Sequence, residues 1–374
     1  MDSEIQGQIM EKFRQGFLAR HQACRQWKKS GRGVMGCFYG LVPREVVHAA
    51  GFLPVQLLEE RDARLEDKAR LLPFLCGMSK NITGQIYEGR YEYLDGILVG
   101  TVCDTNRHVL DIWAHRKVVP YLRLLRTPSK ADHAAWKFYA ADLRRLAREL
   151  EQMGGQEVTE KRLWESIELY NQNRILMERF RSSRNTLGIS AQDALYVLAS
   201  SLVMPVENHN ELLRSLLQTP ARAWDKKSTG PGILICAMNL NMAWDIIRLV
   251  EEYGGRVVAD DFTINARYGI SLVPRQEDPF LALAIGYLRR VPAPGLYSFQ
   301  ERAESLAQQM NSSGAQGLIY LVQLYCDAYA MEYAVLKEKF DLWGIPHMRL
   351  EAEDNSASIQ QLNVRVQSFL ESLI

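Results

Sequence analysis

The chain has 374 residues, of which 45 are basic, 44 are acidic and 47% are hydrophobic. This composition is that of an ordinary globular protein of two or three domains, and the near-zero net charge gives no sign of a nucleic-acid partner or of an anionic membrane surface. The N-terminus lacks the apolar stretch of a signal peptide, and no apolar run is long enough to span a bilayer, so we expect a cytoplasmic protein.

The first third of the chain predicts a leading helix and then strands that alternate with helices. Residues 4–28 contain no helix breaker, residues 34–38 and 53–58 are typical of strands, and Pro43 suits the start of a helix between them. A further short strand is predicted at residues 94–99. Alternation of this kind indicates a parallel sheet built from right-handed βαβ units.

The middle of the chain, residues 130–226, changes to a helical pattern. Leucines recur there on one helix face, and Thr159 suits the N-cap of the next helix. Residues 225–232 predict a linker, after which strands and helices alternate again. We therefore predict an α/β protein with two Rossmann- or flavodoxin-like lobes and parallel sheets, at residues 1–129 and 227–374, with the helical segment inserted between them.

Two strands of this pattern are followed by the same dipeptide. The strand at residues 94–99 leads to Cys103-Asp104, and the strand at residues 315–322 leads to Cys326-Asp327. The likeness continues one helix further on, where residues 120–124 resemble residues 346–350. The repetition predicts two related lobes that carry thiols at the carboxyl ends of their strands, where open α/β sheets bind ligands.

The six cysteines contain no CxxC pair, and a disulfide framework is not expected in a cytoplasmic chain of this size. Most single cysteines are buried and inert, whereas thiolates that gather at a site bind iron–sulfur clusters, zinc or copper(I). Cys76 lies at a third strand-to-helix junction and would join Cys103 and Cys326 at such a site. Spacing alone leaves both interpretations open. The glycines form neither a Walker nor a dinucleotide motif, so no ATP site is expected.

Seven blocks, in the same order along nearly the whole chain, resemble the 2-hydroxyacyl-CoA dehydratase/benzoyl-CoA reductase family. The first is a strand, a Pro-x-Glu sequence, a helix that ends in Ala-Ala-Gly and a Leu-Pro-Val strand. The blocks are residues 36–55, 72–76, 94–104, 170–174, 250–268, 325–327 and 344–346. Residues 265–267 depart from the family pattern, because they lack the glycine that often precedes the arginine of that turn.

The resemblance implies a [4Fe-4S] cluster held by three cysteines, which by position are Cys76, Cys103 and Cys326, with the fourth iron left open. It also implies an acyl-CoA substrate, a homologous second subunit or a second copy of the chain, and an ATP-hydrolysing iron–sulfur activator protein. Enzymes of this family work anaerobically and pass one electron to the thioester. The dehydratases, which are lyases, release the 2-hydroxyl through a ketyl radical, and the reductases, which are oxidoreductases, reduce an aromatic ring.

Five other residues are candidates for substrate binding. Tyr39, Arg44 and Glu45 lie at the loop-to-helix junction after the first strand. Arg107 and His108 open the helix after the first Cys-Asp pair. Each of these side chains is also of a type that serves as a solvated or capping residue.

The remaining features of the two motifs are expected to be structural. Asp104 and Asp327 are predicted to cap the helices that follow them. Cys24, Cys37 and Cys236 are predicted to be non-ligands.

A non-catalytic two-lobed binding or electron-transfer subunit is the alternative function. A double-cubane-cluster reductase ranks third, because the chain lacks the additional cysteine that this branch carries between its equivalents of residues 76 and 103.

Overall fold

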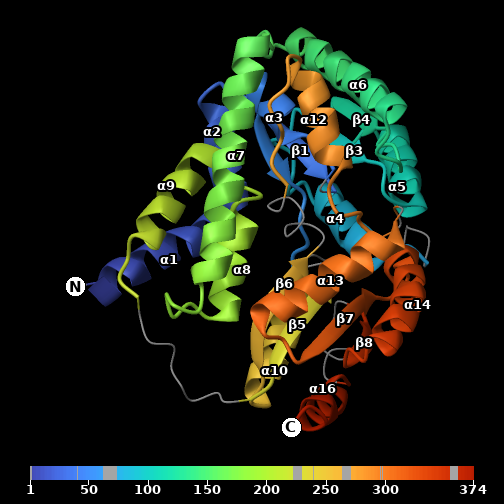
Figure 1. Cartoon of the computed structure of the whole chain (residues 1–374). Helices are drawn as coiled ribbons and strands as arrows, with labels where there is room; N and C mark the ends of the chain where they lie inside the picture. The colour runs from blue at the N-terminus through green and yellow to red at the C-terminus, as the bar shows by residue number, and fades with distance from the viewer. Residues whose placement is uncertain are drawn as a thin grey trace.

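The computed structural model describes residues 2–39, 41–61, 74–221, 230–238, 240–262, 271–294, 296, 298–353 and 361–374. Its strands form two four-stranded parallel sheets, which lie one above the other in Figure 1. The strands are β1 (Val34–Phe38), β2 (Leu53–Gln56), β3 (Gly96–Gly100), β4 (Tyr121–Leu125), β5 (Gly232–Ala237), β6 (Arg256–Phe262), β7 (Gly317–Gln323) and β8 (His347–Ala352). The turn expected at residues 265–267 and most of the predicted linker lie outside the described residues.

The helices that connect these strands are α3 (Arg44–Ala49), α4 (Gly77–Tyr87), α5 (Asp104–Arg116), α10 (Leu240–Glu252), α12 (Pro279–Leu288), α13 (Phe299–Ser313) and α14 (Asp327–Leu342). The other helices are α1 (Asp2–Leu18), α2 (Arg20–Lys29), α6 (His133–Gln152), α7 (Glu160–Ser183), α8 (Ala191–Ser200), α9 (Val206–Leu217) and α16 (Asn363–Glu371). In the part of the chain that the structure describes, no helix is both long enough and apolar enough to cross a bilayer.

The two sheets have the same topology. The first has the order β2-β1-β3-β4 and the second the order β6-β5-β7-β8, with every neighbouring pair parallel. In each sheet the first strand along the chain is an inner strand, the second pairs with it at one edge, and the third pairs with it on its other side. The strand order therefore reverses between β1 and β3 and between β5 and β7, and such reversal points form ligand crevices. The predicted α/β class with two parallel-sheet lobes is confirmed.

The strands of the first sheet are buried on both faces. Met35 and Cys37 of β1 belong to one apolar core with α3, α6, α7 and α12, whereas Phe38 of β1 and Val99 of β3 belong to another core with α4 and α5. Sheets covered on both faces need nearly continuous hydrophobic strands. This requirement is why residues 34–38 and 96–100 could be recognised as strands in the sequence.

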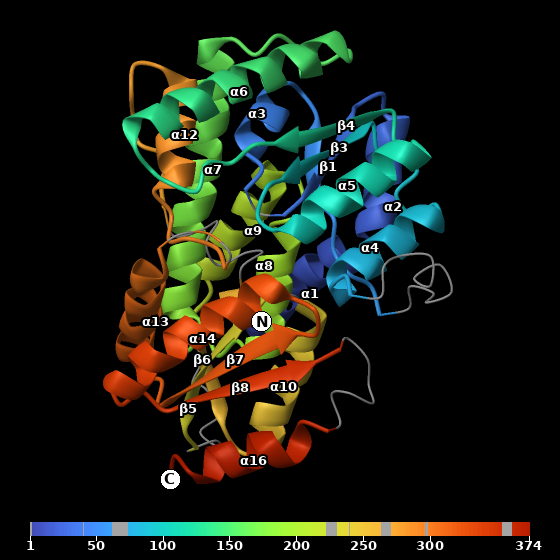
Figure 2. The ribbon, with the colours of Figure 1, turned by 90° about the vertical axis from the view of Figure 1, so that its right-hand side faces the viewer.

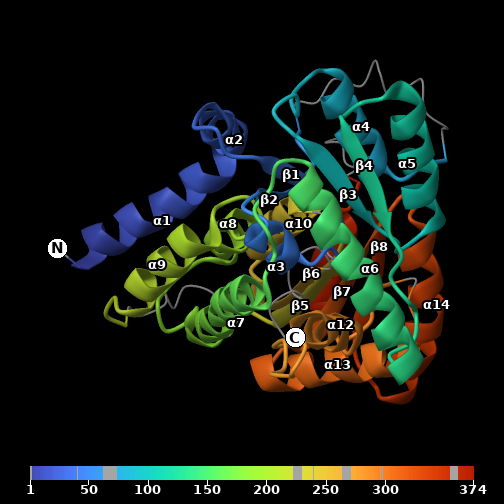
Figure 3. The same ribbon diagram turned by 90° about the horizontal axis from the view of Figure 1, so that it is seen from above.

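The helices of the middle segment pack against both lobes. Helix α6 contacts α12, and α7 contacts α3, so these two helices cover the first sheet. Helix α8 contacts α1 and α10, and α10 belongs to the second sheet. Figure 3 shows α6, α7 and α12 grouped on one side of the molecule, and Figure 2 shows α8 between the two sheets. The boundaries at residues 129 and 226 stay a prediction.

Two predictions about helix ends can be compared with the structure, the N-cap at Thr159 and the extent of the first helix. The Thr159 side chain accepts a hydrogen bond from the Arg162 backbone N–H at the start of α7, as the prediction of an N-cap requires. The single helix predicted over residues 4–28 is wrong, because α1 ends at Leu18 and α2 begins at Arg20. The break accommodates the buried Arg20 guanidinium, which donates to the Phe17 carbonyl and pairs with Glu60.

Candidate functional site

A cavity of about 420 Å³ lies where the carboxyl ends of the two sheets face each other. Both strand-order reversal points contribute to it, through Tyr39 after β1, Val102 after β3, Met238 after β5 and Tyr325 after β7. Its other lining residues are Phe74, Leu75, Cys76, Cys103, Asp104, Thr105, His108, Pro294, Cys326, Asp327, Ala328, Tyr329 and Met331. We call it the cysteine cavity, because three of the six cysteines line it.

The three cysteines occupy equivalent positions at the starts of three helices. Cys76 is the N-cap of α4, Cys103 the N-cap of α5 and Cys326 the N-cap of α14. The positive ends of three helix dipoles therefore point toward the cavity, where they stabilise negative charge. The aspartates that follow two of these cysteines are the first residues of their helices, so the predicted capping role of Asp104 and Asp327 is wrong. The cysteines occupy the capping positions instead.

Burial opposes ionisation of the three thiols. It raises the pKa of Cys76 and of Cys326, and it raises the pKa of Cys103 to about 11. Neighbouring charge adds to this effect, since the Cys76 thiolate disfavours ionisation of both other thiols. Backbone N–H groups in the first helical turns have the opposite effect: that of Ser79 lowers the pKa of Cys76, and that of Tyr329 lowers the pKa of Cys326. A cation at the cavity would therefore be bound strongly by thiolates that water does not stabilise.

Several polar or soft groups contact the sulfurs directly. The Cys76 Sγ atom lies 3.4 Å from Ser79 Oγ, and the Cys103 Sγ atom lies 3.4 Å from Asn106 Oδ1. The Cys326 Sγ atom lies 3.6 Å from the Met238 thioether sulfur. These neighbours were missed in the sequence, although the helical spacing of three residues from Cys76 to Ser79 and from Cys103 to Asn106 was visible there.

Tyr39 was predicted as a substrate residue, and its hydroxyl faces the thiols. Burial raises the pKa of this phenol well above its usual value, and the charges of Cys76, Cys103 and Cys326 raise it further. Its hydroxyl also forms a hydrogen bond that lowers the pKa of the Cys76 thiol. The Tyr39 hydroxyl is therefore placed to donate a hydrogen bond to sulfur inside the cavity.

Two residues that line the cavity have strained backbones. Tyr39 has a φ of 72° and Tyr325 a φ of 63°, and both values lie in the left-handed region that side chains larger than glycine rarely adopt. Only one other non-glycine residue in the described part of the chain shares this feature. Each follows the end of an inner strand, so the strain aims Tyr39 at the thiols and positions Cys326 directly after Tyr325. Strain of this kind concentrates at functional sites.

Gln323 joins the two lobes beside the cavity. Its side chain is 2% exposed, its Oε1 atom accepts a hydrogen bond from the Met78 backbone N–H at 3.1 Å, and its Nε2 atom donates to Glu59 at 3.2 Å. A Cβ on Gly77 would lie 2.7 Å from the same Nε2 atom, so glycine is needed for this approach. The end of β7 thus holds the first turn of α4, which carries Cys76. Sequence reasoning missed Gln323.

The structure separates the other substrate candidates. His108 lines the cysteine cavity, whereas Arg107 lines a neighbouring cavity. Arg44 is buried and donates to the carbonyls of Ser201 and Leu202. Neither cavity includes Arg44 or Glu45.

Glu45 is fully buried in an ion pair with Arg174 and accepts a hydrogen bond from the Tyr287 hydroxyl at 2.8 Å. Burial alone would raise the pKa of Glu45, but the charges of Arg174 and Arg290 bring it below its ordinary value. The carboxylate is therefore ionised and joins helices α3, α7 and α12.

The remaining cysteines lie elsewhere. Cys24 is buried in α2, Cys37 in β1 and Cys236 in β5, and none of them lines the cysteine cavity. Among the described residues, no three His, Cys, Asp or Glu side chains converge closely enough to hold a single metal ion. A four-iron cluster has a different requirement, because each cysteine binds a separate corner of the cluster and the sulfurs surround it rather than meet at a point. Three thiols spread around one cavity fit that requirement.

Comparisons with known proteins find one family along nearly the whole chain. Residues 39–373 match the sequence model of the family described as "2-hydroxyglutaryl-CoA dehydratase, D-component". The chain is similar to one of the subunits of benzoyl-CoA reductase from Thauera aromatica, with 25% identity over 94% of each chain. It is also similar to the beta subunit of (R)-2-hydroxyglutaryl-CoA dehydratase from Acidaminococcus fermentans, with 26% identity over 98% of this chain and 99% of the relative. The chain is also similar to the (R)-phenyllactyl-CoA dehydratase beta subunit of Clostridium sporogenes, with 22% identity over 93% of this chain and 94% of the relative.

Proposed function

Because the chain belongs to the 2-hydroxyglutaryl-CoA dehydratase D-component family, we propose that it is the iron–sulfur subunit of an enzyme that reduces an acyl-CoA thioester by single electrons. One observation carries the proposal: Cys76, Cys103 and Cys326 come from both lobes and line one cavity. Relatives named as dehydratase and as reductase subunits match at nearly equal identity, so the proposal names the thioester class and no particular acyl group.

The proposed cofactor is a [4Fe-4S] cluster held by these three cysteines. Thiolates are the donors that such clusters require, and their potential depends on burial, on net charge and on hydrogen bonds to sulfur. The chain supplies all three influences, since Cys76 and Cys326 are buried and Cys103 is half-buried, the N-termini of α4, α5 and α14 face them, and the Tyr39 hydroxyl is placed to donate to Cys76. When bound, the cluster would supply single electrons of low potential to the thioester.

The chain's own residues prepare the cavity for this chemistry. Leu75, Val102 and Met238 provide an apolar wall that limits water around the sulfurs. His108 is exposed at the cavity and is the candidate to hold or deliver a proton at its imidazole. Electrons at low potential would come from a separate ATP-hydrolysing iron–sulfur activator.

A homologous second subunit, or a second copy of this chain, is the proposed partner. The relatives are named as subunits of larger enzymes. At the mouth of the cysteine cavity, Phe74 is 60% exposed, Met331 69% and Tyr325 44%. Large apolar side chains that gather at one opening are typical of a surface covered in an assembly.

Iron analysis tests the proposal. Protein purified without oxygen is expected to be brown and to contain about four irons per chain. Replacing Cys76, Cys103 or Cys326 by serine should each remove most of the iron and the EPR signal of the reduced cluster. Cys24→Ser and Cys37→Ser are matched controls, because these cysteines are buried away from the cavity, and they should keep the iron. Full iron retention in all three serine variants would refute the assignment.

The non-catalytic alternative makes a different prediction in the same preparation. A binding or electron-transfer subunit that lacks its own cluster would be colourless and would still assemble with its partner. Turnover of an acyl-CoA by the reconstituted enzyme, lost in Cys103→Ser and kept in Cys37→Ser, supports the catalytic role. Unchanged turnover in Cys103→Ser would favour the alternative.

A further inference from the structure

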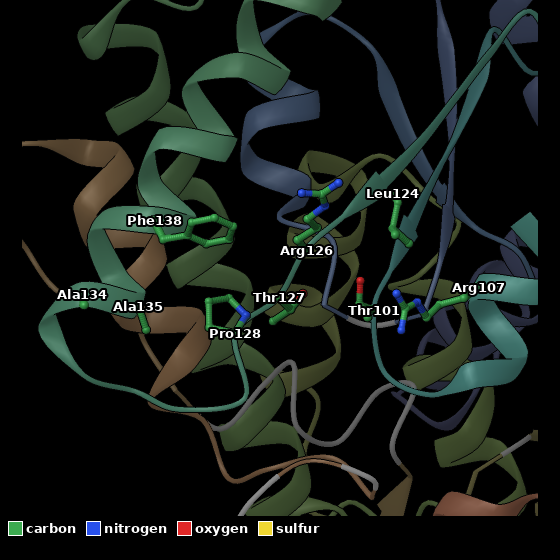
Figure 4. A pocket seen from close by; sticks show the side chains of 9 residues that line it. All are labelled: Thr101, Arg107, Leu124, Arg126, Thr127, Pro128, Ala134, Ala135 and Phe138. Carbon is green, nitrogen blue, oxygen red and sulfur yellow. The ribbon is translucent and has the colours of Figure 1, made fainter.

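A groove lined by arginines lies next to the cysteine cavity. A cavity of about 490 Å³ is lined by Thr101, Arg107, Arg126 and Phe138 among others. A further cavity of about 330 Å³ shares Arg126 and Phe138 with it and adds Arg145. We call the two together the arginine groove. Figure 4 shows Arg107 from α5, Arg126 from the end of β4 and Phe138 from α6 around the first of these cavities.

Three cations of this groove have no partner within the described part of the chain. Arg107, Arg126 and Arg145 are exposed, and no carboxylate there pairs with them. Arg123 in the same groove is different, because it pairs with Asp142 at 2.9 Å and with Glu149 at 2.7 Å. The local carboxylates are thus occupied by one arginine, and three guanidinium groups are left to bind an anion. Guanidinium groups bind phosphate oxygens by paired hydrogen bonds.

An exposed aromatic ring lines the same groove, on the side of Arg126 away from Arg107 in Figure 4. Phe138 is 52% exposed, and it lines both cavities of the groove. Exposed rings beside arginines suit a nucleotide, because the base stacks on the ring while the phosphates bind the guanidinium groups. The groove therefore offers the two kinds of contact that an adenosine phosphate needs.

The groove and the cysteine cavity share one segment as their common wall. Thr101 and Arg107 face the groove, whereas Cys103 and His108 face the cysteine cavity, and all four belong to the β3–α5 junction. A single elongated molecule can therefore place one end in each. We propose that the arginine groove binds the phosphoadenosine end of the acyl-CoA whose thioester enters the cysteine cavity. This inference rests on the proposed function.

Binding measurements on the full chain test the groove. Equilibrium dialysis or calorimetry would compare CoA, 3′-phosphoadenosine 5′-phosphate, pantetheine and ATP. CoA and the phosphoadenosine should compete for one site, and pantetheine alone should bind at least tenfold more weakly. Arg107→Gln, Arg126→Gln and Arg145→Gln should each weaken CoA binding by about tenfold, as expected for a lost charge-assisted hydrogen bond. Phe138→Ala should weaken binding of the phosphoadenosine by a similar factor.

Arg148→Gln is the matched control, because Arg148 is an exposed arginine of α6 that lines neither cavity of the groove. It should bind CoA like the unaltered chain. Equal binding by the groove variants and by Arg148→Gln would overturn the proposal. So would ATP that binds the groove more tightly than CoA, since the site would then serve a free nucleotide. Iron content is measured in every variant. Loss of iron from Cys103→Ser tests the cluster assignment, whereas loss of CoA binding from Arg126→Gln with its iron kept tests the groove, so the two proposals can fail separately.

Discussion

At the scale of single residues, Tyr39 combines a strained backbone with a hydroxyl that faces the thiols. Its φ of 72° would favour glycine, and the fold keeps a tyrosine there. Its hydrogen bond lowers the pKa of Cys76. Donors to cluster sulfurs stabilise the more negative, reduced state, so Tyr39 belongs to the groups that set the potential.

The variant Tyr39→Phe isolates that hydrogen bond. Losing a donor worth about 1 kcal/mol should lower the one-electron midpoint potential of the cluster by roughly 40 mV. An EPR-monitored redox titration measures this shift. Tyr91→Phe is the control, because Tyr91 is a buried tyrosine whose hydroxyl bonds the Leu58 carbonyl, outside the cysteine cavity. An unchanged potential in Tyr39→Phe would contradict the assigned role.

Glu45 shows where inference from single residues failed to locate a side chain. Its place after the first strand suggested contact with substrate, yet its carboxylate is buried against Arg174, which follows 129 residues later. Position at the start of a helix does not reveal which way a side chain points, because that depends on the helix packed against it. The pairing assigns Glu45 to the stability of the fold.

Replacing Glu45 by alanine should therefore lower stability. Arg174 would lose its carboxylate partner in a buried setting, and breaking a buried ion pair on one side costs about 3 to 5 kcal/mol. Urea denaturation measures the loss, and CoA binding by the folded fraction should stay unchanged. Arg275→Ala is the control, because Arg275 and its partner Glu168 form an exposed ion pair worth little. A variant that lost affinity for CoA but kept its stability would restore the substrate assignment.

At the scale of elements, the site is built from the starts of helices α4, α5 and α14. The dipole of each helix favours a thiolate at its N-cap. Two of these helices belong to the first lobe and one to the second, so the cavity exists only while the lobes are held together. Gln323 forms a direct connection between β7 and α4 at this place.

The variant Gln323→Ala should loosen that connection. It leaves the Met78 N–H and the Glu59 carboxylate without this partner, which should lower stability by about 1 to 3 kcal/mol. Iron should also be lost faster to a chelator, since the first turn of α4 carries Cys76. Gly77→Ala should act in the same direction, because the added methyl group displaces the Gln323 amide. The variant Gln300→Ala, which alters an exposed glutamine of α13, is the control. Equal chelator kinetics in all variants would contradict this link.

At the scale of the whole molecule, the middle helices contact both lobes and are held to one another by buried polar groups. His209 of α9 is fully buried, accepts a hydrogen bond at Nδ1 from the Asn173 side chain at 2.8 Å, and donates from Nε2 to the Val197 carbonyl at 3.0 Å. It therefore connects α7, α8 and α9. Burial, with a smaller contribution from the Arg44 charge, lowers its pKa to about 4, although the hydrogen bond to the Val197 carbonyl acts in the opposite direction.

This depressed pKa predicts a pH-dependent stability. The unfolded chain takes up a proton near pH 6.5 but the folded chain does so only near pH 4, so stability is complete above about pH 6.5 and falls as the pH drops toward 4. The loss should reach about 3 kcal/mol. Denaturation by urea between pH 7 and pH 4 measures it. His209→Gln should flatten the dependence, and His115→Gln, which alters an exposed histidine of α5, should not.

Local sequence patterns were enough to predict the two parallel-sheet lobes and the placement of Cys103 and Cys326 between a strand and the helix that follows it. Both predictions rest on features that can be recognised within a few positions, namely hydrophobic runs that form strands and small residues at the ends of those strands. The polar groups that reach the sulfurs, and those that are buried elsewhere, became evident only from the folded chain. Gln323 meets Met78 across 245 residues, and Glu45 meets Arg174 across 129. Partners so distant in sequence are set by the packing of helices, which no local pattern encodes.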